Sequence, residues 1–227
     1  MWFWDPTYVF VLIGVIISAI ASMSVSSTFN RFNKVRSSRN LTAQEAAERI
    51  LHDAGIYDVR IERIRGNLTD HYSPNEKVLR LSDSVYNSTS VAAIGVAAHE
   101  CGHAIQHERG YVPLKLRSLS VPAANFGSML YWPLIIIGII LGTPTLAQIG
   151  IALFCAVIFF QVVTLPVEFN ASRRALAVLS SNGLLYGEEL SGARKVLSAA
   201  AMTYVAAVFA SILQLIRLIL IARRSDD

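Results

Sequence analysis

The longest stretch without a charged side chain runs from residue 118 to residue 167, and it limits what this chain can fold into. It is long enough to cross the hydrocarbon core of a bilayer twice as helix. Residues 6–30 and 196–216 are also free of charge, and each can cross once. Only 16% of all residues are charged, against about 25% in a typical soluble domain. The sequence therefore predicts an α-helical multi-pass membrane protein with about four transmembrane helices.

The segment between the first two apolar stretches has the composition of a soluble domain. Residues 31–117 contain 13 Lys and Arg and 10 Asp and Glu residues. A capping-box pattern, Thr42-Ala-Gln-Glu45, predicts a helix that ends near Gly55. Apolar alternation predicts two strands, and an Ala-rich run with Asn87 or Ser88 as N-cap predicts a second helix, so we expect a small α+β core with strands over 58–65 and 77–82 and a helix over 90–107.

Basic residues flank the apolar stretches on the side of this polar segment. Under the positive-inside rule they place the N-terminus outside and the polar segment in the cytoplasm; they are Arg31, Lys34, Arg36, Arg39, Lys115 and Arg117. Trp2, Trp4 and Tyr8 are expected at the membrane interface. Three arginines follow the last apolar stretch and conflict with an external C-terminus, so the orientation of that segment stays open; they are Arg217, Arg223 and Arg224.

The apolar stretches divide the chain into five segments. We assign a transmembrane anchor, a cytoplasmic α+β segment, a transmembrane hairpin, a cytoplasmic helix, and a fourth transmembrane helix with a tail, over residues 1–28, 29–117, 118–166, 167–195 and 196–227. The net charge of +4 resides beside the apolar stretches rather than among aromatic residues, which argues against a nucleic-acid partner. Cys101 and Cys155 lie in different contexts, so no disulfide is expected.

One motif in the polar segment carries chemistry. His99-Glu-Cys-Gly-His103 fits the H-E-x-x-H pattern, which this composition would produce by chance about 0.004 times. Helix positions four apart lie about 40° apart around the axis and about 6 Å along it, so both imidazoles can reach one metal ion. Glu100 is then placed to act on the attacking water rather than to bind the metal. The alternative is a pair of helix histidines paired with neighbouring carboxylates.

A catalytic zinc site needs a third protein ligand and an open position. His107 lies about 12 Å along the helix from His99, too far to share a metal ion. A metzincin site is excluded because the required Gly and His are replaced by Gln106 and Arg109.

Glu168 is the favoured third ligand because two crossings return it to the side of the histidines. Pro166 is predicted to open a new helix, with Glu168, Ser172 and Ala175 on one face. The alternative pairs Glu168 with an arginine, either Arg173 or Arg174.

These motifs together resemble a known family. The run His99 to His107, preceded by Asp70-His-Tyr-Ser-Pro74 and Val78-Leu-Arg-Leu-Ser82 and followed by Pro166 to Ala175, resembles the YugP-type neutral zinc metallopeptidases of bacterial membranes over essentially the whole chain. The resemblance implies a gluzincin-like core on the cytoplasmic side of a bacterial cell membrane. It also implies one Zn²⁺ per chain, bound by His99, His103 and Glu168. Relatives of similar plan have an acid four residues after the ligand glutamate, where this chain has Ser172.

The expected function is zinc-dependent endopeptidase activity on membrane or misfolded proteins, with Glu100 as general base. The strand over 77–82 is expected to bind an extended peptide at its edge, and the oxyanion donor is left open among His71, Tyr72, Tyr86 and Arg173. Gly95 and Gly102 are expected to allow close packing against a transmembrane neighbour.

Two other functions fit the sequence less well. A non-catalytic zinc-binding membrane scaffold would normally close its metal site with four ligands, and Glu100 argues against it. A transporter or channel is disfavoured because the three complete apolar stretches contain no Asp, Glu, Lys, Arg or His for an ion path.

Overall fold

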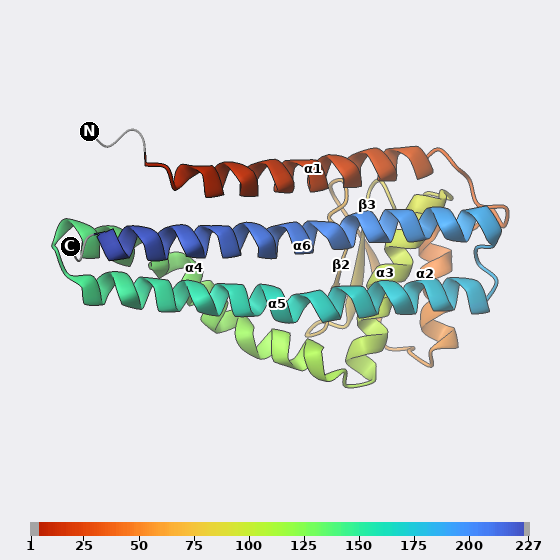
Figure 1. Ribbon diagram of the computed structural model, residues 1–227. Helices are drawn as coiled ribbons and strands as arrows, with labels where there is room; N and C mark the ends of the chain where they lie inside the picture. Colours follow the sequence, from red (N-terminus) through yellow and green to blue (C-terminus); the bar gives the residue numbers. More distant parts are fainter. Residues whose placement is uncertain (1–4, 225–227) are drawn as a thin grey trace. The chain divides into compact units, whose positions relative to one another are not determined.

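The structure, a computed structural model, describes residues 5–224 and is mostly helical (Figure 1). The elements follow one another as α1 (Tyr8–Phe32), α2 (Ala43–Asp53), β1 (Arg60–Ile64), β2 (His71–Ser73), β3 (Val78–Ser82), α3 (Val91–Glu108), α4 (Val112–Ile140), α5 (Pro144–Ser181) and α6 (Gly187–Arg224). Of the three aromatic residues expected at the membrane interface, Trp2 and Trp4 lie outside the described residues.

Four helices, α1, α4, α5 and α6, are long and apolar enough to cross a membrane. This agrees with the prediction of a helical chain with four such helices and a small sheet. Both cysteines are free, as expected, with Cys101 buried and Cys155 exposed.

The chain divides into two compact units, which we describe separately. The first unit contains most of the apolar helices: the chain up to Ser22, Lys115–Pro166, and the chain from Met202 onward. The second unit comprises Met23–Leu114 and Val167–Ala201, and it contains the sheet, α2 and α3.

Helix α5 continues through Pro166, so the prediction that Pro166 opens a new helix is wrong. Proline removes only its own amide bond to the carbonyl four residues earlier. In an apolar helix, ending the helix would leave several backbone groups unpaired, which costs more than losing one bond. Residues 167–195 therefore form the end of α5, a turn and the start of α6 rather than one helix.

The second unit has a three-stranded sheet in the order β1-β3-β2. Strand β3 pairs in parallel with β1, with Arg60 opposite Val78, and antiparallel with β2, with Tyr72 opposite Leu79. The segment over 77–82 is thus the central strand, and it has no edge for a substrate peptide. Its continuous burial agrees with a central position, since Val78, Leu79 and Leu81 are fully buried. The three-residue β2, which sequence patterning did not predict, occupies one edge, and β1 occupies the other.

The N-caps of α2 and α3 explain where these two helices begin. Thr42 caps α2 with the predicted reciprocal bonds to Glu45. Ser90, rather than Asn87 or Ser88, caps α3, because its hydroxyl accepts the amide of Ala93 at 3.1 Å. Both helices pack into one apolar core with the sheet and the ends of α5 and α6.

Candidate metal centre

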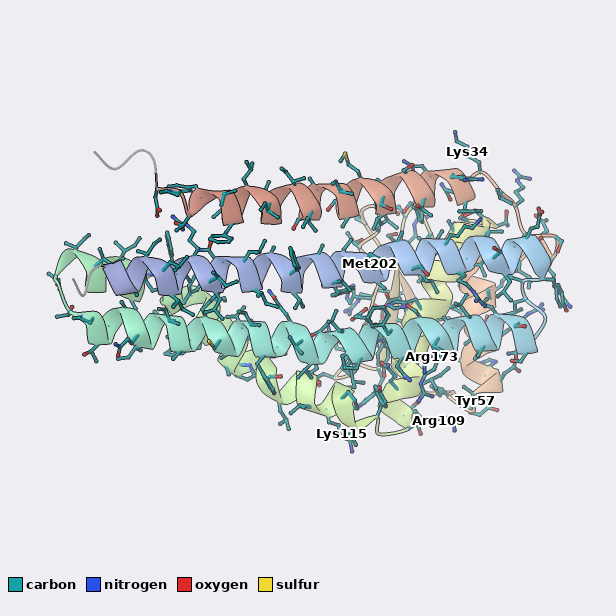
Figure 2. The ribbon with its side chains drawn as sticks, in the orientation of Figure 1. Lys34, Tyr57, Arg109, Lys115, Arg173 and Met202 are labelled. Carbon is teal, nitrogen blue, oxygen red and sulfur yellow. The ribbon has the colours of Figure 1, made fainter. Side chains whose placement is uncertain are left out.

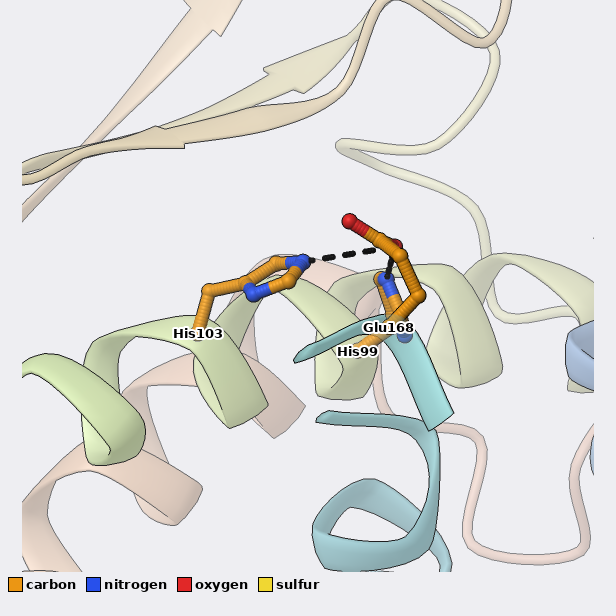
Figure 3. A group of neighbouring side chains, drawn as sticks. All are labelled: His99, His103 and Glu168. Atoms are coloured by element: carbon orange, nitrogen blue, oxygen red, sulfur yellow. Dashed lines mark hydrogen bonds and ion pairs between the residues drawn. The ribbon is translucent and has the colours of Figure 1, made fainter. Parts of the chain in front are cut away.

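Three side chains of the second unit converge on one point: His99 and His103 from α3, and Glu168 from α5 (Figure 3). One ligand atom from each lies within 4.8 Å of the others. Glu168 Oε2 lies 3.3 Å from His99 Nε2 and 3.7 Å from His103 Nε2. The structure therefore brings together the three residues predicted as metal ligands, although Glu168 is 65 residues beyond His103 in the sequence.

The helical spacing of α3 places the two imidazoles side by side. Their ring centroids are 4.8 Å apart, with the rings nearly perpendicular at 83°. The side chains of His99 and His103 are only 16% and 12% exposed, and that of Glu168 is 4% exposed. The group is thus largely shielded from solvent.

Gly102 allows α5 to come close enough for Glu168 to reach the histidines. A Cβ atom at this position would lie 2.5 Å from the carbonyl oxygen of Ala171, so the two helix backbones are in direct contact. Gly95 is packed less tightly, since its Cβ would lie 3.4 Å from the Cβ of Ala193 in α6. Both glycines therefore face neighbouring helices, as expected, and Gly102 makes the closer approach.

The donor set fits a catalytic zinc ion. Zinc binds imidazole nitrogen and carboxylate oxygen at about 2.0 to 2.2 Å, so neighbouring ligand atoms in a tetrahedral site lie about 3.3 to 3.6 Å apart. The two separations from Glu168 Oε2, 3.3 and 3.7 Å, are close to that range, and all three ligand atoms lie within 4.8 Å of one another. Two imidazoles and one carboxylate also leave a fourth position open.

Each histidine has a partner at its other ring nitrogen. His99 Nδ1 lies 3.1 Å from Ser172 Oγ, so the serine that replaces an acid in relatives of similar plan does contact this ring. His103 Nδ1 lies 3.0 Å from Gln106 Oε1. These bonds leave both Nε2 atoms directed at Glu168, as second partners of metal-binding histidines commonly do.

The role of Gln106 was missed by reasoning from the sequence. Its side chain is fully buried, and its amide nitrogen donates to the carbonyl of Val167 at 2.8 Å and to Asn170 Oδ1 at 3.0 Å. The sequence signal that could have revealed this role is a glutamine three residues after His103. It lies on the same side of a helix whose other buried residues are mostly apolar.

The charges around the centre favour a protonated His103 in the metal-free protein. Burial alone lowers the pKa of His103, but its bond to Glu168 and the charges of Glu100 and Glu168 outweigh this and raise the pKa. Glu100 is 8% exposed. Its charge also adds to the effect of burial in raising the pKa of Asp70, against the bonds that Asp70 accepts from Ser82.

The other predicted residues lie outside the group of three. His107 Nδ1 lies 2.9 Å from the hydroxyl of Tyr72 on β2. Burial, with the charges of Asp58 and Glu108, raises the pKa of Tyr72 to about 12. Arg173 is exposed, and Arg174 donates to Asn170 at 2.7 Å. His71 Nδ1 lies 3.0 Å from the carbonyl of Thr69, and Tyr86 packs against the core.

Comparisons with known proteins point to a family of zinc peptidases. A family model described as "Putative neutral zinc metallopeptidase" matches residues 7–223. The chain is also similar to a Bacillus subtilis (strain 168) protein described as "Putative membrane protease YugP", at 46% identity over 221 residues that cover 97% of this chain and 98% of that protein. No solved structure matches the chain. Because both matches span nearly the full length, the chain belongs to the family of neutral zinc metallopeptidases.

Proposed function

We propose that this chain is a membrane-embedded, zinc-dependent endopeptidase. One Zn²⁺ per chain is held by His99, His103 and Glu168, and Glu100 is the general base. The observation that carries the proposal is the convergence of the three ligand atoms within 4.8 Å, two of them from an H-E-x-x-H helix.

The protein groups divide the chemistry of peptide hydrolysis between them. A zinc ion bound at this centre supplies a Lewis acid that polarises the scissile carbonyl and lowers the pKa of water. Glu100 takes a proton from the attacking water and passes it to the leaving amine as the C–N bond breaks. The two outer partners, Ser172 and Gln106, hold the imidazoles in position.

The substrate peptide is proposed to bind at β2. Within the part of the chain that the structure describes, β2 is paired on one side only, so its other edge can take an extended strand. Tyr72 of β2 contacts His107, one helical turn beyond His103 on α3. The small sheet over α3 would then act as a zincin-like core.

The location of the activity is also a proposal. Four apolar helices and the membrane-protease relative support a membrane protein. The basic residues flanking those helices support a bacterial cell membrane orientation in which the metal centre faces the cytoplasm. Peptides or proteins, including membrane and misfolded proteins, are the proposed substrates.

The test compares zinc content and hydrolysis of an unstructured protein by detergent-purified variants. Glu100→Gln keeps the zinc and lowers hydrolysis by about 10²-fold or more, since it removes the general base. Glu168→Ala loses the zinc and the activity together. Glu108→Gln is the matched control, because it removes an exposed carboxylate from the same helix.

Full hydrolysis by Glu100→Gln, or by protein stripped of metal with a chelator, would rule out the mechanism. Normal zinc content in Glu168→Ala would reject Glu168 as a ligand. A zinc-binding scaffold predicts that wild type binds zinc without hydrolysing any test protein.

A further inference from the structure

A chain of hydrogen bonds runs from Arg174 to His103 within the second unit. Arg174 Nε donates to Asn170 Oδ1 at 2.7 Å. Gln106 Nε2 donates to the same oxygen at 3.0 Å and to the carbonyl oxygen of Val167 at 2.8 Å. Gln106 Oε1 then lies 3.0 Å from His103 Nδ1. These hydrogen bonds therefore join Arg174 to one of the two histidines.

The donor and the acceptor of each of these hydrogen bonds follow from the groups at the Arg174 end. A guanidinium has donors and no acceptor, so Asn170 must present its oxygen to Arg174. A backbone carbonyl only accepts, so Gln106 must present its amide nitrogen to Val167 and Asn170. The oxygen of Gln106 then faces His103, and a bond to it requires a proton on Nδ1.

We infer that Arg174, Asn170 and Gln106 form a positioning relay that fixes His103 in the Nδ1–H form. In that form the lone pair of Nε2 points at Glu168 and the proposed zinc position (Figure 3). This inference rests on the proposed zinc function and adds three positioning residues to it. None of the three touches a reacting atom; Gln106 acts through His103, and Arg174 acts through Asn170 and Gln106.

Burial makes the orientation of Gln106 hard to reverse. Its side chain is fully buried, so a flipped amide could not turn to water for compensation. The flip would set its oxygen against the oxygens of Val167 and Asn170. His99 differs, because its partner Ser172 has a hydroxyl that can donate or accept and so does not by itself fix a tautomer.

The same side chain also ties the two helices of the centre together. Val167 directly precedes Glu168, so the bond from Gln106 holds the α5 backbone beside one ligand while its oxygen orients another. Loss of Gln106 should therefore loosen both halves of the centre at once.

The first measurement is zinc affinity by chelator competition in the detergent-solubilised full chain. Gln106→Met keeps the approximate volume but makes none of the bonds, and we expect zinc binding about 10- to 100-fold weaker than wild type. Gln106→Glu retains an acceptor for His103 and should recover part of the affinity. Arg174→Met should weaken zinc binding in the same direction by a smaller factor.

Arg109→Met is the matched control for Arg174→Met. Arg109 is exposed and lines a surface pocket that Arg174 also lines, but it is not part of the relay. Melting curves of the metal-free variants separate unfolding from loss of orientation. If Gln106→Met does not fold, the comparison of Arg174→Met with Arg109→Met decides the matter.

The second measurement reads the Nδ1 proton directly, by nitrogen NMR of zinc-loaded protein with ¹⁵N-labelled histidine. The signal of His103, assigned by its absence from the spectrum of His103→Gln, should show a proton on Nδ1 that exchanges with solvent at least about 10-fold more slowly in wild type than in Gln106→Met. Equally fast exchange of this proton in both proteins, or wild-type zinc affinity in both Gln106→Met and Arg174→Met, would overturn the relay. Wild type that binds no zinc would instead overturn the proposed function.

Discussion

His103 is both a proposed metal ligand and a residue whose pKa depends on the charges around it. In the metal-free fold its pKa is raised by Glu168 and Glu100 against the opposing effect of burial, while an unfolded histidine has a pKa of about 6.5. Between these two values the folded state binds more protons than the unfolded state. The stabilisation is therefore fully present below about pH 6.5 and is lost as the pH rises through the folded pKa.

Because the pKa of His103 is raised in the fold, the stabilities of the metal-free and the zinc-loaded protein should change with pH in opposite directions. The melting temperature of chelator-treated protein should fall as the pH is raised above about 6.5, and His103→Gln should flatten that trend. The zinc-loaded protein should become more stable over the same range, because zinc binds the deprotonated imidazole. Metal-free wild type that becomes more stable with rising pH in this window would contradict the assignment.

At the residue scale, the sequence was sufficient wherever one helix sets the geometry. His99 and His103 are four positions apart on one helix, so local spacing alone places them together. Glu168 was found by counting membrane crossings, which needs no side-chain detail. Gln106 could not be found in this way, because its partners at Val167 and Asn170 come from another helix and depend on how α3 packs against α5.

At the scale of elements, the contact between α3 and α5 decides whether the ligands meet. Replacing Gly102 by Ala would put a Cβ atom 2.5 Å from a backbone oxygen of Ala171, so the helices would have to move apart. We expect Gly102→Ala to cost about 1 to 3 kcal/mol of unfolding free energy and to weaken zinc binding at least about 10-fold. Chelator competition and denaturant unfolding measure the two effects.

Gly95→Ala on the same helix is the control for this variant. Its Cβ would make an ordinary contact at 3.4 Å from Ala193, and alanine favours helix by about 1 kcal/mol over glycine. Its zinc affinity should match wild type. Equal losses of affinity in both variants would mean that the close approach at Gly102 has no special part in assembling the centre.

The elements that the sequence predicted less well are those that depend on long-range pairing. The capping box gave the start of α2 because its bonds are local. β2 has only three residues, too few for a recognisable alternation, and its pairing with β3 put the expected edge strand at the centre of the sheet. Pro166 was misread because a proline signals a helix start in water but is tolerated inside an apolar helix.

At the scale of the whole molecule, the proposed orientation predicts which surfaces face the cytoplasm. In a variant lacking both native cysteines, a single cysteine at exposed Thr143 should react with a membrane-impermeant maleimide on intact cells. Cysteines replacing the exposed residues Lys34 and Tyr57 (Figure 2) should react only after the membrane is permeabilised. Labelling of Lys34→Cys and Tyr57→Cys in intact cells, with Thr143→Cys protected, would reverse the proposed orientation.

Of the three arginines near the C-terminus, Arg217 has an aromatic partner in the structure. Within the first unit, the guanidinium of Arg217 lies 4.5 Å from the centre of the Tyr8 ring, and Arg217 is only 7% exposed. Tyr8 begins α1, so this contact places Arg217 at the N-terminal end of that helix. A basic residue held in such a contact is compatible with an external C-terminus.

The uncharged partners of the histidines set the net charge of the centre. If the proposed Zn²⁺ is bound, its two positive charges would meet the two negative charges of Glu168 and Glu100 while His99 and His103 stay neutral, so the loaded centre would carry no net charge. An acid at position 172, as in relatives of similar plan, would add a negative charge that the serine here avoids. Emptying the centre leaves two carboxylates in a mostly buried place, where uncompensated charge is costly, so metal release should be accompanied by proton uptake.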